Sequence, residues 1–272
     1  SEFMFMNRDD VPSEDEQVEQ LKSVIKVMGK NPVTIRTLDV GAEKPVAALL
    51  NGIEESAVSN LGLRGIRLAL TQPEVLETQI RALLMAAVGK PLRIMLPMVK
   101  DVAEFRAAKA IYDRLLNEIS PQQRATDVQL GVMIEVPSSA LLAPTLAAEV
   151  DFFSVGTNDL TQYTLAIDRG HPELSAQADG LHPAVLRLIQ MTVEAAHAHG
   201  KWVGVCGELA SDAMAVPVLV GLGVDELSVS ARQIPLVKAR LREFDLAQAQ
   251  ASAQLALSKA TSDEVRDALE AS

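Results

Sequence analysis

Short runs of β-branched and other apolar residues alternate with longer amphipathic stretches along the whole chain of 272 residues. The longer stretches repeat apolar residues at helical spacing, which predicts helices between the runs. The alternation of the two patterns is typical of repeated βα units with parallel strands. The sequence predicts strands at residues 33–40, 92–99, 130–136, 152–157, 202–207 and 226–230, with a shorter seventh candidate at residues 65–70.

Capping residues and prolines mark where several helices begin. Ser13 with Glu16 forms a capping box, and Thr261 with Glu264 repeats the pattern inside the Ala-rich segment 244–272. We therefore expect this last segment to form one or two peripheral helices. Two prolines stand where a first helical turn accepts them, at Pro73 and Pro183.

The composition favours a barrel over a sandwich. Apolar residues make up 48% of the chain but aromatic residues only 3%, which suits strands buried on both faces under closely packed helices. The predicted fold is a (β/α)₈ TIM-type barrel formed by residues 1–272 as one domain. The chain reaches its first capped helix without completing a strand, so we expect the first barrel strand to be missing or incomplete.

Charge and cysteine content exclude several classes of function. The formal net charge is -11, which disfavours a nucleic-acid surface because such a surface needs clustered basic residues. No apolar run approaches the length of a membrane span. The single cysteine, Cys206, excludes an internal disulfide and fits a reducing compartment, so we expect a cytoplasmic protein.

Polar residues close several of the predicted strands, where the chemistry of parallel barrels collects. Arg36 and Asp39 end the first run, Glu135 ends another, and Asn158 with Asp159 follows a third. A buried arginine needs an anion, and two carboxylates facing one space suit Mg²⁺. Strand-end carboxylates more often cap helices or pair with arginine, so each alone is weak evidence for a metal.

Further residues of the same kind strengthen the pattern. The turn at Gly156, Thr157 and Asn158 offers backbone and amide donors that suit phosphate oxygens. Further arginines lie near the ends of strand candidates or on the long loop that follows, at Arg64, Arg67, Arg93 and Arg169. Several such arginines in an acidic protein indicate that an anionic ligand is held locally.

Six segments together carry a resemblance to a known family. They are RTLDVG from Arg36, GLRGIR around Arg64, LRIMLPM around Arg93, GVMIEVP around Glu135, DFFSVGTNDLTQYTLAIDRG over residues 151–170, and GVCGELASD around Cys206. Taken in order, they resemble the C-terminal phosphoenolpyruvate-binding domain of enzyme I of the bacterial phosphoenolpyruvate:sugar phosphotransferase system. Pyruvate phosphate dikinases and phosphoenolpyruvate synthases share this barrel chemistry. Residues 41–67 differ from the usual enzyme I segment and are more similar to a fructose-type multiphosphoryl transfer protein.

The resemblance implies a phosphoenolpyruvate-protein phosphotransferase and assigns a role to each site residue. By that resemblance, Mg²⁺ is held by Glu135 and Asp159, and Cys206 gives a proton to the enolpyruvate that remains after phosphoryl transfer. The substrate's phosphate and carboxylate are held by Arg36, Arg64, Arg93, Asn158 and Arg169.

The resemblance also implies partners. The family's phosphorylated histidine lies in a separate upstream domain, in a sequence context that none of the chain's own histidines has: His171, His182, His197 and His199. We therefore expect a histidine-bearing upstream domain, the phosphocarrier protein HPr and a second copy of the chain as partners, with pyruvate as product. Two alternatives remain at this stage, a Mg²⁺-dependent aldolase or lyase barrel and a phosphoenolpyruvate-sensing dimerisation module without turnover.

Overall fold

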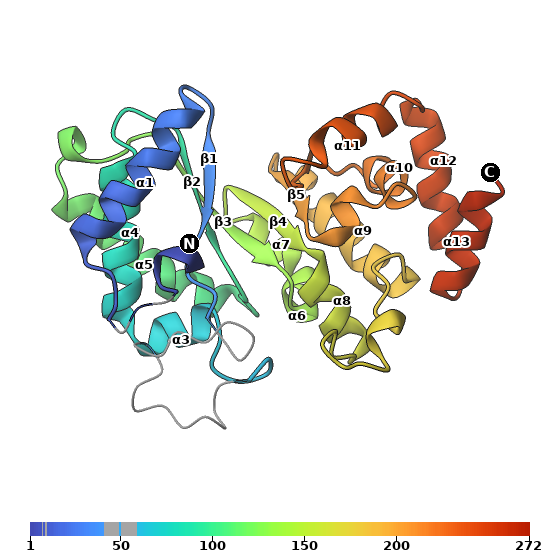
Figure 1. The fold of residues 1–272 in the computed structure, drawn as a ribbon, viewed down its shortest axis with the longest axis horizontal. Helices are drawn as coiled ribbons and strands as arrows, with labels where there is room; N and C mark the ends of the chain where they lie inside the picture. Colours follow the sequence, from blue (N-terminus) through green and yellow to red (C-terminus); the bar gives the residue numbers. More distant parts are fainter. Residues whose placement is uncertain (7, 9, 41–48, 50–58) are drawn as a thin grey trace. The chain divides into compact units, whose positions relative to one another are not determined.

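The computed structural model describes residues 1–6, 8, 10–40, 49 and 59–272 (Figure 1). These residues form two compact units, Ser1–Val132 and Met133–Ser272. Both units combine parallel strands with helices, so the predicted α/β class is confirmed. The described residues contain six strands and not the eight of a closed barrel, so the complete barrel stays a prediction. Most of the divergent segment 41–67 lies outside the described residues.

The strands follow one another in parallel pairs within each unit. In the first unit, β1 pairs with β2 and β2 pairs with β3, and in the second β4 pairs with β5 and β5 with β6. Each strand overlaps a predicted run, although most end earlier than the apolar pattern does. Their bounds are β1 Val33–Arg36, β2 Leu92–Leu96, β3 Val128–Ile134, β4 Phe152–Gly156, β5 Trp202–Cys206 and β6 Glu226–Leu227.

Helices cover the strands of the first unit. Helix α1 (Glu14–Met28) packs on α4 (Pro73–Ala86), which also contacts α5 (Val102–Glu118). The fully buried face of α4 repeats at helical spacing and includes Ile80, Leu83 and Leu84. Two short 3-10 turns, Glu2–Met4 and Pro121–Gln123, complete the described elements of this unit.

Two predictions about the first unit have opposite outcomes. The capping box of α1 is confirmed, because Ser13 Oγ accepts from the Glu16 N–H at 3.3 Å and the Glu16 carboxylate accepts from the Ser13 N–H at 2.7 Å. The seventh strand candidate, residues 65–70, is wrong. These residues form helix α3 (Ile66–Thr71), which buries Ile66 and Leu68 but is too short for the apolar pattern to separate helix from strand.

The second unit is organised around helix α9 (Pro183–Ala198), which contacts both β4 and β5. Phe152 and Trp202 start these two strands in register, and their rings stack with centroids 4.6 Å apart. The remaining helices are α6 Pro137–Leu141, α7 Ala143–Ala147, α8 Thr157–Leu165, α10 Ala215–Gly221 and α11 Ile234–Arg240, with 3-10 turns at Ser175–Gln177 and Glu208–Ser211.

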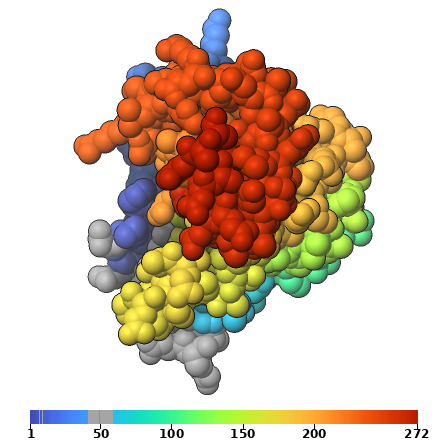
Figure 2. Space-filling model, turned by 90° about the vertical axis from the view of Figure 1, so that its right-hand side faces the viewer, coloured from blue at the N-terminus to red at the C-terminus, as the bar shows by residue number. Residues whose placement is uncertain are grey.

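The chain ends in two helices, α12 (Leu246–Leu257) and α13 (Ser262–Glu270), as predicted for the C-terminal segment. Figure 2 shows the C-terminal residues in red at the surface of the second unit, next to the yellow segment that follows α8. Helix α12 nevertheless buries Ala249, Ala253 and Ala256 against its neighbours and packs closely on α10. Its small residues allow this close approach, so α12 is part of the core of its unit.

Of the capping box predicted at Thr261 and Glu264, one of the two hydrogen bonds is present. Thr261 Oγ1 accepts from the Glu264 N–H at 3.2 Å, as a cap should. The Glu264 carboxylate, however, accepts from the N–H of Ala260 and not from that of Thr261. None of the helices in the described ranges has both the length and the apolar composition that crossing a membrane requires.

Candidate functional site

Two of the predicted arginines meet at one carboxylate in the first unit. Asp39 is buried, and its Oδ2 lies 3.2 Å from Arg36 Nη1 and 3.0 Å from Arg64 Nη2, while Arg64 Nε donates to Oδ1 at 3.1 Å. Arg36 also contacts Glu2 at 2.9 Å. Burial raises the pKa of Glu2, but the charges of Arg36 and of the amino terminus, together with hydrogen bonds to the carboxylate, outweigh burial and lower that pKa to about 2. Protein carboxylates thus fix the orientation of both guanidinium groups.

A tight turn, and not a strand end, presents Arg64. The next residue, Gly65, has a φ of 54°, and a Cβ there would come within 2.9 Å of Met98 side-chain atoms. Glycine is therefore required by both conformation and space. The turn ends at the start of α3 and directs the Arg64 side chain at Asp39.

Arg93 also lies elsewhere than expected. It is the second residue of β2, so its backbone is at the amino-terminal end of the strand and not at the carboxyl end. Its Nε donates to Gln129 Oε1 at 3.1 Å on the neighbouring strand β3. The sequence reading that placed this arginine with the other strand-end residues is wrong about its position in the strand.

The two predicted metal ligands are both buried in the second unit. Glu135 follows β3 and is 1% exposed, and Asp159, in the first turn of α8, is 7% exposed. The Glu135 carboxylate lies directly over Gly156, because a Cβ on that glycine would come within 2.8 Å of Oε2. The lack of a side chain at Gly156 leaves room for this carboxylate beside the residue from which α8 begins.

These carboxylates fit Mg²⁺ in number and chemical type. Mg²⁺ takes oxygen ligands, often one or two carboxylates completed by water and substrate phosphate. Within the described ranges, His, Cys, Asp and Glu side chains form no cluster of three or more that could hold a metal ion. A site built on Glu135 and Asp159 would thus bind the ion together with an anionic substrate.

Hydrogen bonds join the residues at the carboxyl ends of β4 and β5. Thr157 Oγ1 donates to the Cys206 carbonyl at 2.8 Å, and the Glu208 N–H donates to Asn158 Oδ1 at 3.0 Å. Gly207, between these contacts, has a φ of 97°, and a Cβ there would collide with Thr157 Oγ1. Two segments 50 residues apart in sequence therefore form one fixed surface at the carboxyl ends of the strands.

The Cys206 thiol is at the end of β5, partly exposed on this surface. Ser154 Oγ donates to its sulfur at 3.8 Å, and the sulfur contacts the Val155 carbonyl at 3.5 Å. Both partners belong to β4. These contacts orient the thiol without burying it completely, which is consistent with a reactive group as well as a structural one.

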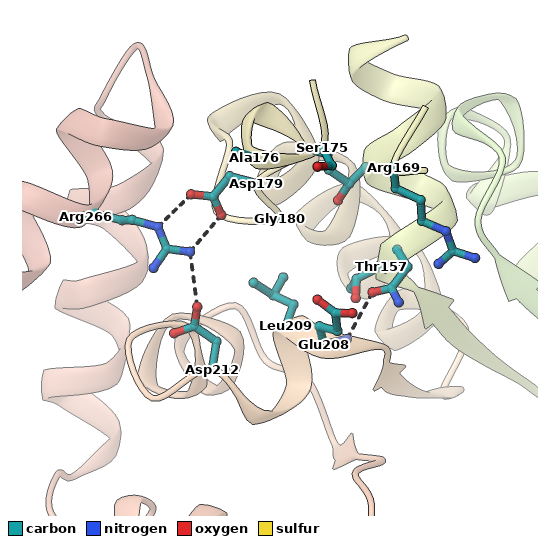
Figure 3. A pocket seen from close by; sticks show the side chains of 13 residues that line it. Thr157, Arg169, Ser175, Ala176, Asp179, Gly180, Glu208, Leu209, Asp212 and Arg266 are labelled. Atoms are coloured by element: carbon teal, nitrogen blue, oxygen red, sulfur yellow. Dashed lines mark hydrogen bonds and ion pairs between the residues drawn. The ribbon is translucent and has the colours of Figure 1, made fainter. Parts of the chain in front are cut away.

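A pocket of about 480 Å³ opens beside these residues (Figure 3). Its walls come from α8, from the segment after α8, from the segment after β5 and from α13. Arg169 and Arg266 lie on opposite sides in Figure 3. The pocket is lined by Thr157, Asn158, Thr161, Arg169, Ser175, Ala176, Ala178, Asp179, Gly180, Glu208, Leu209, Asp212 and Arg266.

An ion cluster that no sequence motif predicts lies at one end of this pocket. Arg266 contacts Asp179 at 2.6 Å and Asp212 at 3.1 Å, across 87 and 54 residues of sequence. Burial raises the pKa of Asp179, but hydrogen bonds from Arg266 and from the Leu181 N–H, together with the charges of Arg266 and His182, outweigh burial and hold that pKa below its usual value. No local motif joins these residues, so nothing in the sequence pattern indicated the cluster.

The four histidines have structural contacts. His197 Nε2 lies 2.9 Å from Asp225 Oδ2, and a ring nitrogen of His199 lies 3.0 Å from the Ala195 carbonyl. His182 Nδ1 caps α9 by accepting from the Ala184 N–H at 3.1 Å. His171 Nδ1 accepts from the Glu173 N–H at 3.2 Å.

Comparison with known proteins identifies the family. Residues 1–246 match the profile of the PEP-utilising enzymes' PEP-binding domain, where PEP is phosphoenolpyruvate. The phosphoenolpyruvate-protein phosphotransferase of Staphylococcus carnosus is 44% identical over 99% of this chain and 47% of its own length. The multiphosphoryl transfer protein of Rhodobacter capsulatus is 46% identical over 98% of this chain and 31% of its own length. The chain thus spans half or less of the length of these relatives.

A solved structure supports the fold. A citrate lyase from Burkholderia xenovorans superposes with a TM-score of 0.53 over 96% of this chain and 88% of its own, at 19% sequence identity. At that identity the likeness concerns the fold alone and does not favour lyase chemistry. The family profile and the two relatives confirm the resemblance found in the six sequence segments. The chain belongs to the PEP-binding domain family of the phosphoenolpyruvate-utilising enzymes.

Proposed function

We propose that this chain is the catalytic domain of a phosphoenolpyruvate-protein phosphotransferase. It binds phosphoenolpyruvate and Mg²⁺, passes the phosphoryl group to a histidine on a separate domain, and releases pyruvate. The observation that carries the proposal is that hydrogen bonds join the carboxyl ends of β4 and β5. There Asn158 and Asp159, in the first turn of α8 directly after β4, lie next to Cys206 at the end of the paired strand β5, and the three residues carry the proposed roles in substrate binding, metal binding and proton transfer.

The arginines supply the charge that the substrate needs. Phosphoenolpyruvate carries about -3 near neutral pH, counting its carboxylate and about -1.5 to -2 on the phosphate. Guanidinium groups bind such oxygens in a forked geometry that lysine does not reproduce. Anchoring by Asp39 fixes Arg36 and Arg64 before the substrate arrives, which lowers the entropy lost on binding. We assign substrate contacts to Arg36, Arg64, Arg93, Asn158 and Arg169.

Glu135 and Asp159 would hold the Mg²⁺ ion. When bound, the ion supplies positive charge at the transferring phosphoryl group and helps to orient it. Both carboxylates are buried, and Gly156 leaves the space in which the Glu135 carboxylate lies. Asn158, directly before Asp159, orients the substrate from the same turn.

Cys206 completes the reaction by moving a proton. The nitrogen of the acceptor histidine forms a bond to phosphorus as the bond from phosphorus to the enol oxygen breaks, which leaves enolpyruvate. The Cys206 thiol then gives its proton to the methylene carbon, pyruvate forms, and the thiolate regains a proton from solvent. Its position at the end of β5 suits a donor that must reach bound substrate.

The proposal extends to the whole molecule. Residues 1–272 act as one phosphoenolpyruvate-binding barrel domain in the cytoplasm. Its partners are the upstream histidine-bearing domain, the phosphocarrier protein HPr and a second copy of the chain. Leu236 on α11 and Leu246 at the start of α12 are exposed apolar side chains, which the pairing of two copies could cover.

Pyruvate release tests the function. The chain is mixed with the histidine-bearing domain of an enzyme I, phosphoenolpyruvate and Mg²⁺, and pyruvate is followed with lactate dehydrogenase. We expect pyruvate in proportion to the histidine domain phosphorylated, and none when either protein is omitted. A chain that binds phosphoenolpyruvate but yields no pyruvate or phosphohistidine under these conditions would refute the catalytic assignment.

A further inference from the structure

Helix α13 is fixed to the second unit by a small number of contacts. Val265 is its one buried residue, and Thr261 caps its first turn. The helix lies beyond residues 1–246, which match the family profile. The next residue after Val265 is Arg266, so the buried valine sets the direction in which this arginine leaves the helix.

The Arg266 guanidinium is held as a fork between two carboxylates (Figure 3). Its Nε and Nη2 donate to the two oxygens of Asp179, at 2.6 Å and 2.9 Å. The same Nη2 donates to Asp212 Oδ2 at 3.1 Å. Bidentate arginine–carboxylate pairs fix direction as well as distance, which a lysine in the same place would not do.

Asp179 ends the segment that carries Arg169. Its Oδ1 also accepts from the Leu181 N–H at 3.0 Å, which forms the turn into α9. Ten residues earlier, the Arg169 N–H donates to Gln162 on α8. The segment is thus fixed near Arg169 by α8 and at its far end by Arg266 through Asp179.

Asp212 ends the segment that follows Cys206. Its Oδ1 accepts from the Met214 N–H at 2.8 Å at the start of α10, while its Oδ2 contacts Arg266. Between Cys206 and Asp212 the backbone turns tightly, with the Ala210 N–H donating to the Gly207 carbonyl. A displacement of Asp212 would therefore be passed along a short, hydrogen-bonded turn to the end of β5.

The two segments also touch each other. A Cβ at Gly180 would lie 3.0 Å from a Leu209 side-chain carbon, so the Leu209 side chain packs closely against the backbone of Gly180. Both segments line the same pocket, with Arg266 on one side and Arg169 on the other (Figure 3). The position of one segment is therefore linked to that of the other through this contact and through Arg266.

We propose that Arg266 is a positioning residue for the phosphoenolpyruvate site. By joining Asp179 to Asp212 it holds the segment bearing Arg169 against the segment that follows Cys206, so the C-terminal helix sets the shape of the pocket. The inference rests on the proposed function, because its effect is on substrate binding. Arg266 does not touch the substrate and acts through the two aspartates.

Arg266 is expected to contribute to the geometry of the pocket more than to the stability of the fold. Arg266 is 36% exposed, and exposed pairs contribute little to global stability. A substitution should therefore change the geometry of the pocket more than the stability of the fold. Misplacing binding groups by about 1 Å can cost roughly 100-fold in rate, so a smaller shift is expected to be visible in affinity.

Calorimetric titration of the full chain with phosphoenolpyruvate and Mg²⁺ tests the proposal. Arg266→Gln should raise the Kd for phosphoenolpyruvate roughly tenfold, with little change in the thermal unfolding midpoint. The Kd of Arg266→Lys should lie between that of wild type and that of Arg266→Gln, because lysine keeps the charge but cannot form the bidentate contact. The control is Arg187→Gln. The Arg187 guanidinium donates to the Leu257 carbonyl and does not line the pocket. The Kd of this variant should equal that of wild type.

A double-mutant cycle checks that the effect passes through Asp179. Asp179→Asn alone should raise the Kd about as much as Arg266→Gln, and the double variant should show no further loss, because both remove the same link. If Arg266→Gln does not fold, Asp179→Asn with Arg266→Lys still tests the prediction. Additive effects, or a Kd in Arg266→Gln and Asp179→Asn equal to that of wild type, would overturn the proposal.

The design separates this inference from the function on which it rests. If the wild-type chain does not bind phosphoenolpyruvate, the proposed function fails. If wild type binds and the Arg266 and Asp179 variants bind equally well, the function stands and the positioning role is refuted. A fall in unfolding midpoint with unchanged Kd would likewise refute positioning, because it would mark Arg266 as a residue of stability alone.

Discussion

Cys206 has neighbours that orient its sulfur but do not enclose it. Ser154 donates to the sulfur, and the Val155 carbonyl lies on its other side, while part of the residue stays exposed. A lone intracellular cysteine is often only a small buried apolar residue. A partly exposed thiol at the end of β5 can instead serve as an acid, since an ordinary thiol with a pKa of about 8.5 is mostly protonated at pH 7.

We predict that Cys206→Ala keeps its affinity for phosphoenolpyruvate and Mg²⁺ but loses pyruvate formation by about 100-fold or more, the usual contribution of a general acid. Pyruvate is measured with lactate dehydrogenase in the presence of the histidine-bearing domain, and affinity by calorimetry on the same preparation. Turnover close to wild type in Cys206→Ala would assign protonation to water or to another side chain.

The proposed metal ligands give a second prediction at single residues. Glu135→Gln and Asp159→Asn should each weaken Mg²⁺-dependent phosphoenolpyruvate binding at least roughly tenfold, since even outer-shell partners of a metal ion contribute about 10- to 100-fold. The exposed Glu173→Gln, in the segment after α8, provides the matched control and should bind as wild type does. Undiminished binding by Glu135→Gln would reject the metal assignment.

The sequence indicated those candidate site residues that stand directly after or at the end of an apolar run. Glu135 and Asp159 each close an apolar strand, and Cys206 ends another, so their neighbours in sequence marked them. Arg266 had no such signal, because its partners lie 87 and 54 residues away and its own helix is polar. Long-range ion pairs depend on tertiary packing, which periodicity alone does not encode.

At the scale of elements, the packing of α10 on α12 depends on Gly221. A Cβ at this position would collide with the backbone of Ala249 and lie within 2.9 Å of Ala253 Cβ. Gly221→Ala should therefore lower the free energy of unfolding by about 1–3 kcal/mol, the usual cost of overpacking, or more if the backbone cannot shift. Urea unfolding followed by circular dichroism measures the change.

Gly204→Ala on β5 is the matched control for this substitution. A Cβ there would meet its nearest atom at 3.4 Å, an ordinary van der Waals contact. The free energy of unfolding should change by less than about 1 kcal/mol, because alanine also reduces the entropy of the unfolded chain. Equal effects at both positions would show that the α10–α12 contact is not tight.

The ion pair between Arg266 on α13 and Asp179 predicts that the free energy of unfolding depends on pH. The pKa of Asp179 is lower in the folded chain than its usual value, so its contribution to stability is present above the unfolded pKa and is lost as pH falls through the folded pKa. The difference in unfolding free energy between wild type and Asp179→Asn should thus be constant from about pH 7 to 5 and shrink below about pH 4. A difference that grows on acidification would contradict the ion pair.

The sequence predicted the elements better than their ends. All six strands of the described residues overlap predicted runs, and the pattern is clearest for β4, where every residue is buried. Residues 65–70 were misread because IRLAL is apolar over too few residues to show helical or strand period, and the turn at Gly65 then starts a helix. Strand β1 ends at Arg36 although apolar residues continue, since hydrogen bonding and not hydropathy ends a strand.

At the scale of the whole molecule, the proposed dimer can be tested by sedimentation. The wild-type chain should show the dimer mass at micromolar concentration, with or without ligand. Leu236→Asp, on α11, should shift the mass toward the monomer, because it places a charge on a side chain that is 65% exposed in the single chain. Monomer mass in wild type under every condition would count against self-association.

For the molecule as a whole, we propose that this chain of 272 residues binds phosphoenolpyruvate in a Mg²⁺-dependent way. The most direct measurement is calorimetric titration of the purified chain with phosphoenolpyruvate, once with Mg²⁺ and once with a chelator. The account predicts saturable binding to one site per chain with Mg²⁺ and at least roughly tenfold weaker binding without it. Absence of saturable binding with Mg²⁺, or equal affinity in the chelator, would contradict it.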